Sequence, residues 1–221
     1  MTTGRPLKFH VVEPYRQRLD RDSRWALDEG SIFFEDRGAV QKALRDITRR
    51  LDELGIPYAV VGGMALFKHG HRRFTEDVDL LVTPESLREI HDKLDGLGYV
   101  PPFTGSKNLR DASSGVKIEF LITGGYPGDG KPKPVSYPDP RAVSVVIDGI
   151  SYVKLSTFIE LKLASGMTGG IHRMKDVTDV VELIKSAKLA RDLVQELNPH
   201  VQGKYLELWE AVQHPSPNDE T

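Results

Sequence analysis

The chain contains no cysteine among its 221 residues. This absence excludes disulfide bonds, thiolate zinc sites and cysteine nucleophiles, and it agrees with a reducing compartment. Any metal bound by this protein must therefore be held by oxygen or imidazole ligands.

The sequence also lacks a large excess of one charge and a long apolar run. Its 30 basic and 32 acidic side chains give a formal net charge of −2, so the molecule as a whole does not attract nucleic acid or an anionic membrane. Its apolar runs fall well short of the ~20 residues that a bilayer requires, and MTTGRPLKFH at the N-terminus has no stretch typical of a signal peptide. We therefore expect a soluble, cytoplasmic protein with no membrane partner.

Hydrophobic periodicity predicts an α/β (α+β) fold, with a mixed sheet flanked by helices and followed by a helical part. Residues 39–54 have helical spacing, and two short apolar strands, near 57–62 and 76–83, enclose a short helix. We expect four segments along the chain: an N-terminal extension (1–37), a mixed-sheet core (38–154), a C-terminal helical subdomain (155–212) and a disordered tail (213–221).

Further elements follow from local signals. Pro84 is typical of a first helical position, "VKIEFLITG" alternates as a strand does, and Asp148-Gly149 predicts the turn of a hairpin. The segment 123–140 is too rich in Gly and Pro for regular structure. Thr157 and Glu160 have the spacing of a capping box at the start of the helical part, although Ser156 could equally cap that helix.

The N-terminal extension is charged and only weakly periodic. It contains an aromatic group that could dock on the core, formed by Trp25, Phe33 and Phe34.

Two acids stand two positions apart inside an apolar strand. Asp77 and Asp79 should project to one side while Val78 and Leu80 enter the core. Two carboxylates held this closely repel one another unless a proton or cation lies between them, and Mg²⁺ prefers oxygen ligands. The pattern favours a metal site for phosphoryl transfer, although an acidic pair is also common on a merely solvated strand face.

The residues before this strand add to the metal-site interpretation. Gly62-Gly63 lies at a predicted strand-to-helix turn, where the missing side chains let phosphate oxygens approach the backbone. Arg72 and Arg73 could complement phosphate charge, and Thr75 could bond to phosphate or to the backbone. Each residue alone could equally serve packing, a solvated turn or a cap.

At this point the sequence resembles a known family. It is similar to the signature of the DNA polymerase β nucleotidyltransferase superfamily, and most similar to the minimal and AbiEii-type members. The similarity is carried by Gly-Gly, a short helix, His-Gly and then Arg73-Phe-Thr75-Glu-Asp77-Val-Asp79. The family's third acid is best matched by Glu119 in "VKIEF". The resemblance spans about residues 56–185 and continues in "ELKLASGMTGGIHRMKDVTDVVELI", where the family pattern is matched by Lys162, Arg173, Lys175, Asp176 and Asp179.

The resemblance implies a nucleotidyltransferase core that binds a nucleoside triphosphate such as ATP and two Mg²⁺ ions. Asp77, Asp79 and Glu119 would be the catalytic metal ligands, and the nucleotide would be bound by Gly62, Gly63, Arg73, Thr75, Lys162 and Lys175. The implied acceptor is a hydroxyl of a small molecule, a tRNA end or a protein, and a toxin-like member would have a cognate antitoxin. The chain has Gly62-Gly63 where many members have Gly-Ser, and Glu119 where Asp is frequent.

Other functions stay open at this stage. The chain could be a degenerate member that binds nucleotide or a partner without turnover, or an RNA-binding or protein-binding module that uses the basic patch Lys68 to Arg73.

Three other functional motifs are not supported by the sequence. "GYPGDGKP" lacks the Ser or Thr of a P-loop, because Pro132 follows Lys131. His69 and His71 do not share a helical face, so we expect them to be solvated or to face phosphate rather than to bind a transition metal. No Gly-x-Ser-x-Gly elbow is present, which argues against an ordinary serine hydrolase.

Overall fold

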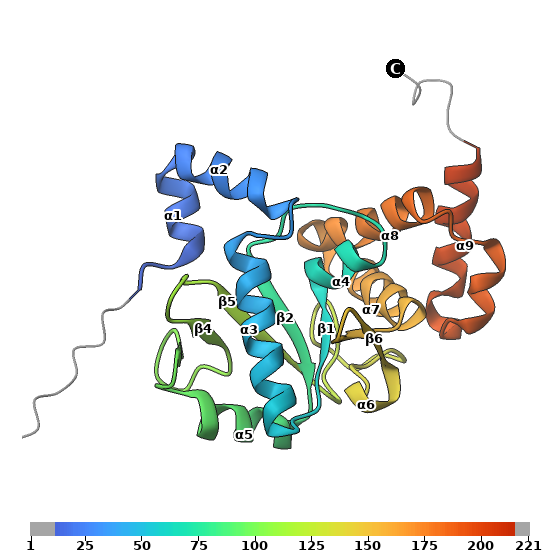
Figure 1. Ribbon diagram of the computed structural model, residues 1–221. Coiled ribbons are helices and arrows are strands. Elements are labelled where there is room, and N and C mark those ends of the chain that lie inside the picture. Colours follow the sequence, from blue (N-terminus) through green and yellow to red (C-terminus); the bar gives the residue numbers. More distant parts are fainter. Residues whose placement is uncertain (1–11, 215–221) are drawn as a thin grey trace, which may run out of the picture.

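The computed structural model describes residues 12–214 and contains one seven-stranded mixed sheet flanked by helices (Figure 1). The strand order is β3-β4-β5-β2-β1-β7-β6. The strands are β1 (Ala59–Val61), β2 (Asp77–Val82), β3 (Tyr99–Val100), β4 (Leu109–Asp111), β5 (Lys117–Ile122), β6 (Ser144–Ile147) and β7 (Ile150–Val153). The α-helices are α1 (Tyr15–Arg21), α2 (Ser23–Phe33), α3 (Ala39–Leu54), α4 (Gly62–Lys68), α5 (Pro84–Leu94), α6 (Pro140–Val143), α7 (Leu155–Thr168), α8 (Met174–Ser186) and α9 (Pro199–Gln213). Two 3₁₀ segments, η1 (Gly170–Arg173) and η2 (Arg191–Glu196), connect the last helices.

The centre of the sheet combines both strand directions. β2 runs parallel to β5 and antiparallel to β1, and β1 runs parallel to β7. Val78 and Leu80 of β2 are fully buried, while Asp77 and Asp79, which alternate with them, are only partly buried. The alternation expected from the sequence therefore separates a core side of β2 from a polar side, and the prediction of a mixed sheet flanked by helices is confirmed.

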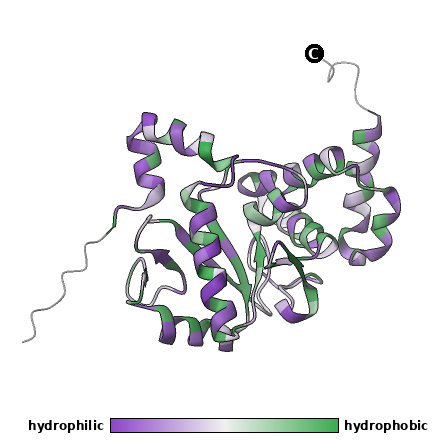
Figure 2. Ribbon diagram, viewed as in Figure 1, coloured by the Kyte–Doolittle hydropathy of each residue, from purple (hydrophilic) through white to green (hydrophobic). Residues whose placement is uncertain are grey.

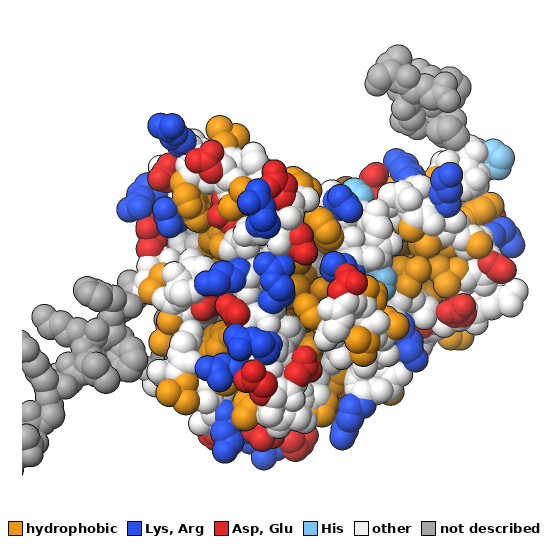
Figure 3. All heavy atoms as spheres, viewed as in Figure 1, with side chains coloured by type: hydrophobic (Ala, Val, Ile, Leu, Met, Phe, Trp, Pro, Cys, Tyr) orange, Lys and Arg blue, Asp and Glu red, His pale blue; other side chains and the backbone are white. Residues whose placement is uncertain are grey.

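Helix α3 crosses the sheet in front, in the view of Figure 1, and buries one face against it. Its apolar and polar residues alternate along the ribbon in Figure 2 because Val40, Leu44, Ile47 and Leu51 are buried at helical spacing. The helix ends at Gly55, whose positive φ of 68° forms the left-handed cap that the sequence predicts. The outer surface on this side carries basic and acidic side chains next to one another (Figure 3).

The N-terminal segment is more regular than its weak periodicity suggests, since it forms α1 and α2. Phe33 is fully buried and Trp25 packs partly buried against the core, whereas Phe34 stays 46% exposed. Two of the three aromatic residues thus dock as expected. The helices are short and stabilised mainly by these tertiary contacts, so their sequence pattern is weak.

The helical part beyond β7 has its own apolar cluster. Side chains of α7, α8 and α9 meet there, including Ile159, Val180, Val201 and Tyr205. The predicted capping box is wrong: α7 begins at Leu155 after Lys154, which places Ser156 and Thr157 inside the helix. Glu160 instead accepts a hydrogen bond from the backbone N–H of Asn198, at the start of α9.

The remaining connections follow turn chemistry. Asp148 and Gly149 both have positive φ, 50° and 79°, as a two-residue hairpin turn requires. Helix α5 starts at Pro84 after its cap Thr83, as predicted. The short strands β3 and β4 were not predicted from the sequence. Most of the predicted disordered tail, residues 215–221, lies outside the described residues, and Gln213 is the last residue of α9.

Within residues 12–214, none of the helices has both the length and the apolar composition needed to cross a bilayer.

Candidate active site

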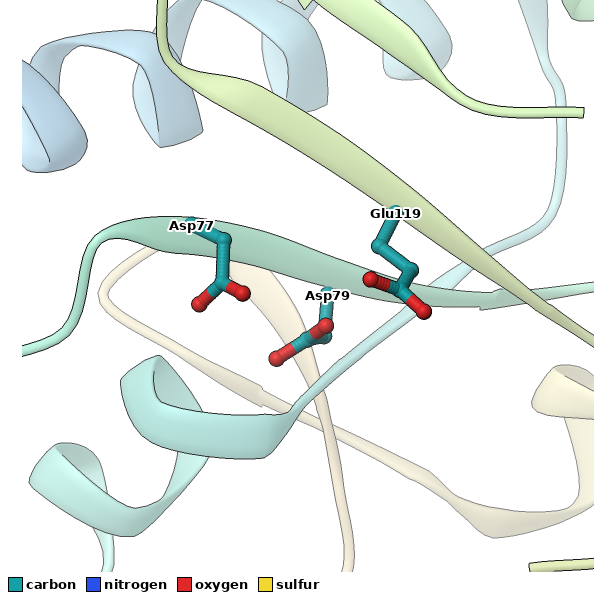
Figure 4. Close-up of side chains that lie close together, drawn as sticks. All are labelled: Asp77, Asp79 and Glu119. Carbon is teal, nitrogen blue, oxygen red and sulfur yellow. The ribbon is translucent and has the colours of Figure 1, made fainter. Parts of the chain in front are cut away.

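Three carboxylates from two neighbouring strands point toward one another. Asp77 and Asp79 come from β2 and Glu119 from β5, and Asp79 and Glu119 are register partners in the parallel pair (Figure 4). One oxygen from each residue lies within 4.8 Å of the others. All three side chains are partly buried. This arrangement offers a divalent ion three hard oxygen ligands at one point.

The electrostatics of this acid triad (Asp77, Asp79 and Glu119) also favour a cation. Burial raises the pKa of Asp79 to about 7, and the charges of Asp77 and Glu119 act in the same direction. Lys117 forms an ion pair with Glu119 and offsets part of the negative charge. Like-charged carboxylates at this distance are stable only with a bound proton or cation. The donor set therefore fits Mg²⁺ or a similar ion.

Thr75 orients the first acid of the triad. Its buried hydroxyl donates a hydrogen bond of 2.9 Å to Asp77 Oδ1. Among residues 12–214 no side chain donates to the other oxygen, Asp77 Oδ2, which leaves it available for a metal. A donor behind a ligand typically fixes the orientation of the ligand. The sequence placed Thr75 near phosphate or backbone and did not predict this contact.

The glycine pair lies directly against these acids. Gly62 has a φ of +60°, and a Cβ added there would lie 1.8 Å from Asp79 Oδ2. A Cβ at Gly63 would lie 2.6 Å from both Cβ and Oγ1 of Thr75. Any side chain at either position would therefore displace a residue of the site. The Thr75 side chain also fills the space that a serine at position 63 would need.

A cavity of about 300 Å³ opens above the acid triad. Its walls come from β1, β2, β5, the loop after β5, and the facing sides of α7 and α8. The predicted site residues that line it are Gly62, Gly63, Arg73, Thr75, Asp77, Asp79, Glu119, Lys162, Arg173, Lys175 and Asp176. The structure thus brings together residues that lie more than a hundred positions apart in the sequence.

The basic residues of the cavity are of two kinds. Lys162 lies 2.7 Å from a carboxylate oxygen of Asp176 and 2.7 Å from one of Asp179. Arg73 donates to both oxygens of Asp179, at 2.8 and 2.9 Å. By contrast, Arg173 and Lys175 are exposed at the mouth, although Arg173 reaches to 3.8 Å from Asp176.

These contacts form a buried ion network of Arg73, Lys162, Asp176 and Asp179, to which Ser165 contributes a hydrogen bond to Asp176. Burial alone would raise the pKa of Asp179, but the hydrogen bond from Arg73 and the charge of Lys162 outweigh it and hold that pKa below its usual value. The predicted phosphate ligands Arg73 and Lys162 are therefore already paired with aspartates.

Several lining residues were not predicted as site residues. Phe158, Ser165 and Tyr137 lie in the cavity wall, and burial raises the pKa of Tyr137 to about 12. Tyr137 belongs to the Gly- and Pro-rich loop, and two backbone hydrogen bonds join the ends of this loop: Gly124 N–H donates to the Tyr137 carbonyl, and Tyr137 N–H donates to the Gly125 carbonyl. The composition of that loop predicted irregular structure, but no pattern indicated which residue enters the cavity.

His69 has a structural role. Its Nε2–H donates to the carbonyl oxygen of Val153 at 2.8 Å, and burial lowers the pKa of the ring. It therefore ties the end of α4 to β7, and the ring is only partly exposed.

No protein-family model matches the chain, and no curated protein matches it. Several solved structures, some with nucleotidyltransferase-like names, are similar to the chain. An antigenic nucleotidyltransferase-like protein from Paracoccidioides brasiliensis is 17% identical, with 78% of this chain and 91% of that chain covered and a TM-score of 0.45. ANT(2'')-Ia in complex with adenylyl-2''-tobramycin is 14% identical, with 78% and 95% covered and a TM-score of 0.47.

JHP933 from Helicobacter pylori is 18% identical, with 82% and 83% covered and a TM-score of 0.43. At these identities and TM-scores, the neighbours do not define the activity of this chain, which has to be inferred from its own cavity residues.

Proposed function

We propose that this protein is a Mg²⁺-dependent nucleotidyltransferase that transfers a nucleoside monophosphate from a nucleoside triphosphate to an acceptor hydroxyl and releases pyrophosphate. The observation that carries this proposal is the acid triad at the floor of a cavity whose mouth is basic. The class of reaction follows from the chemistry of these groups, since clustered carboxylates bind the metal and exposed cations attract phosphates.

In this proposal Asp77, Asp79 and Glu119 hold the metal, with two ions expected. The bound metal would lower the pKa of the acceptor hydroxyl and neutralise charge on the triphosphate. Thr75 keeps Asp77 in its orientation, and Glu119 completes the ligand set on the neighbouring strand. Loss of Glu119 should therefore impair the chemical step more than nucleotide binding.

The other cavity residues divide between binding and positioning. Gly62 and Gly63 leave room for the side chains of Asp79 and Thr75, and their backbone would meet the phosphates beside the acid triad. Lys175 and Arg173, which are exposed residues of the cavity lining, would meet the outer phosphates. Arg73 and Lys162, already paired with aspartates, act chiefly by fixing the wall of the cavity, and a phosphate would have to share their charge.

The acceptor and the biological role are further parts of the proposal. A small molecule, a tRNA end or a protein hydroxyl would each satisfy the chemistry. ANT(2'')-Ia, solved in complex with adenylyl-2''-tobramycin, is an example of a protein that binds a small adenylylated molecule. A toxin-like, AbiEii-type role with a cognate antitoxin stays a prediction from the sequence resemblance.

The first test is thermal stabilisation by ATP, CTP, GTP and UTP, each with and without Mg²⁺. We expect wild type to be stabilised only when metal and at least one nucleotide are both present, and Asp77→Asn to lose this effect. Glu89→Gln is the matched control, because Glu89 is an exposed acid of α5 remote from the cavity lining. If no nucleotide shifts the wild-type transition, the proposal is wrong.

Pyrophosphate release then separates an enzyme from a degenerate binding module. Wild type incubated with the stabilising nucleotide, Mg²⁺ and crude cell extract should release pyrophosphate, and Asp77→Asn should not. Nucleotide binding without release under these conditions would instead identify a binding module.

A further inference from the structure

A second cavity reaches the acid triad from another direction. It has a volume of about 300 Å³ and lies between α1, β4 and the residues just before β2. Its charged lining consists of Arg16, Asp20, Glu76, Asp77, Arg110 and Lys117. Asp77 lines both this cavity and the one that contains Gly62 and Gly63. Asp77 is therefore a residue that the two cavities share.

A polar row on the sheet links this second cavity to the metal site. Arg110 of β4 is the register partner of Lys117 in β5, and Lys117 is the register partner of Asp77 in β2. Register partners present their side chains on the same face of a sheet. Because neighbouring strands lie ~4.8 Å apart, the Cα atoms of Arg110 and Asp77 are separated by about 10 Å.

Arg110 is the cation of this row that is left without an acid. Lys117 is paired with Glu119, and Arg16 lies 3.4 Å from Glu76. Among residues 12–214, no carboxylate lies within 4.0 Å of the Arg110 guanidinium. Burial lowers the pKa of Arg110 with no nearby charge to oppose the effect. A partly desolvated guanidinium without a partner is well suited to receive an anion.

The wall opposite β4 is a firmly attached part of the fold. The backbone N–H of Tyr15, at the start of α1, donates to the carbonyl of Gly115 at 3.1 Å, and the Tyr15 side chain is only 1% exposed. Gly115 has a φ of +75°, and a Cβ there would lie 2.2 Å from the carbonyl oxygen of Glu13. Helix α1 is thereby held in close contact with the β4–β5 turn. Asp20 is exposed on this wall.

We propose that the second cavity binds the acceptor and that Arg110 recognises a phosphate group on it. This inference rests on the proposed function. The acceptor hydroxyl must approach the α-phosphorus from the side opposite the leaving pyrophosphate. If the triphosphate lies beside Gly62 in the first cavity, the acceptor can approach Asp77 from the second cavity. The acceptor oxygen bonds to the α-phosphorus, the bond from that phosphorus to the pyrophosphate oxygen breaks, and the hydroxyl proton passes to solvent.

The chemistry of the acceptor follows from the row of residues. Its hydroxyl lies near Asp77 and its phosphate near Arg110, so the two groups are separated by about the span of one nucleotide. The terminal nucleotide of an RNA and a small phosphorylated alcohol both meet this requirement.

The test measures binding to the second cavity while the first is filled. Wild type is saturated with Mg²⁺ and a non-hydrolysable triphosphate analogue, and cytidine 5′-monophosphate or glycerol 3-phosphate is then titrated by calorimetry. Cytidine and glycerol are the phosphate-free controls. We expect at least one phosphate probe to bind more tightly than its control. Preference for the nucleotide would indicate an RNA end, and preference for glycerol 3-phosphate a small molecule.

Variants assign the binding to Arg110. Arg110→Ala should weaken binding of the phosphate probe about tenfold or more, and Arg110→Lys should weaken this binding less. Arg16→Ala, in the same cavity but paired with Glu76, should have little effect. All variants should bind the Mg²⁺ analogue complex as wild type does. Equal probe binding by wild type and Arg110→Ala overturns the inference, as does the absence of any preference for phosphate.

The two proposals fail in different steps. If wild type does not take up the Mg²⁺ analogue complex, the proposed function is wrong and the acceptor inference falls with it. If the Mg²⁺ analogue complex binds but no phosphate probe then binds, only the acceptor inference is wrong.

Discussion

Two groups of acids lie at or next to the same cavity and differ in how their charge is balanced. The acid triad has Lys117 as its direct ion-pair partner, on Glu119. The buried ion network sets Arg73 and Lys162 against Asp176 and Asp179, so its charges match. The pKa directions follow the same division, raised for Asp79 and lowered for Asp179.

The difference separates a ligand site from a structural one. An unbalanced acid cluster is costly for the folded protein until a cation arrives, and such groups are typical of functional sites. A balanced network is costly only when one member is removed. Here the network joins the turn before β2 to α7 and α8, which places the helical part next to the sheet.

The largest effect on stability should come from breaking the network. Asp179→Ala leaves Arg73 and Lys162 short of a buried partner, and we expect a loss of about 3–5 kcal/mol in the free energy of unfolding. Urea denaturation measures it, with Glu182→Ala as control because the Glu182–Lys185 pair lies on the surface of α8. A loss below about 1 kcal/mol, as for surface pairs, would remove the distinction between the two groups.

Removing the charge of Asp79 from the acid triad should have the opposite effect and stabilise the folded protein. The folded-state pKa of Asp79, about 7, lies above its unfolded value of ~3.9, so above pH 7 the carboxyl is ionised in both states and its charge is less favourable in the folded one. Without metal, Asp79→Asn should be about 1–3 kcal/mol more stable than wild type at pH 8, given ~1.4 kcal/mol per pKa unit.

This advantage should shrink as the pH falls through 7 and vanish near pH 4, because wild-type Asp79 is then protonated in both states. Denaturation in chelator across this range provides the measurement. An advantage that is independent of pH would show that the triad charge is not its cause.

A smaller effect, on metal affinity, is expected at Thr75 and tests whether this residue orients Asp77. Thr75→Val removes the hydroxyl that orients Asp77 while keeping the volume of the side chain. We expect Mn²⁺ affinity to fall about tenfold, which is typical for residues behind a metal ligand. Calorimetric titration measures this loss, and Thr178→Val, at an exposed position of α8, is the control. Unchanged affinity would show that Asp77 needs no support from Thr75.

The smallest stability effect is expected at the cavity mouth. Lys175 is exposed, so Lys175→Ala should change the free energy of unfolding by less than about 0.5 kcal/mol. Its loss should nevertheless weaken triphosphate binding severalfold, measured by titration with Mg²⁺ and the analogue. Lys93→Ala, on the exposed side of α5, should change neither quantity. Equal nucleotide binding in both variants would remove Lys175 from the proposed site.

The sequence was most informative where local pattern determines geometry. Strand alternation predicted that Asp77 and Asp79 share a face, and the parallel register of β5 brings Glu119 beside them. Gly55 and Asp148-Gly149 ended their elements as expected, because positive φ is a local property.

Tertiary contacts account for what the sequence did not predict. The Arg73–Asp179 pair spans 106 residues, and no local pattern selects that aspartate over phosphate as the partner of Arg73. Helices α1 and α2 are short and depend on the burial of residues such as Phe33. Strand β4 has only three residues, too few for a period to be recognised.

The parallel pairing of β1 with β7 has a consequence for the order of events during synthesis. Val60 pairs with Tyr152, so β1 leaves the ribosome long before its neighbour exists. Until β7 arrives, the apolar strand β1 is an open sheet edge able to pair with another chain. Such non-local pairing also slows folding. Chains truncated before residue 150 should therefore aggregate even though they contain all three acids of the triad.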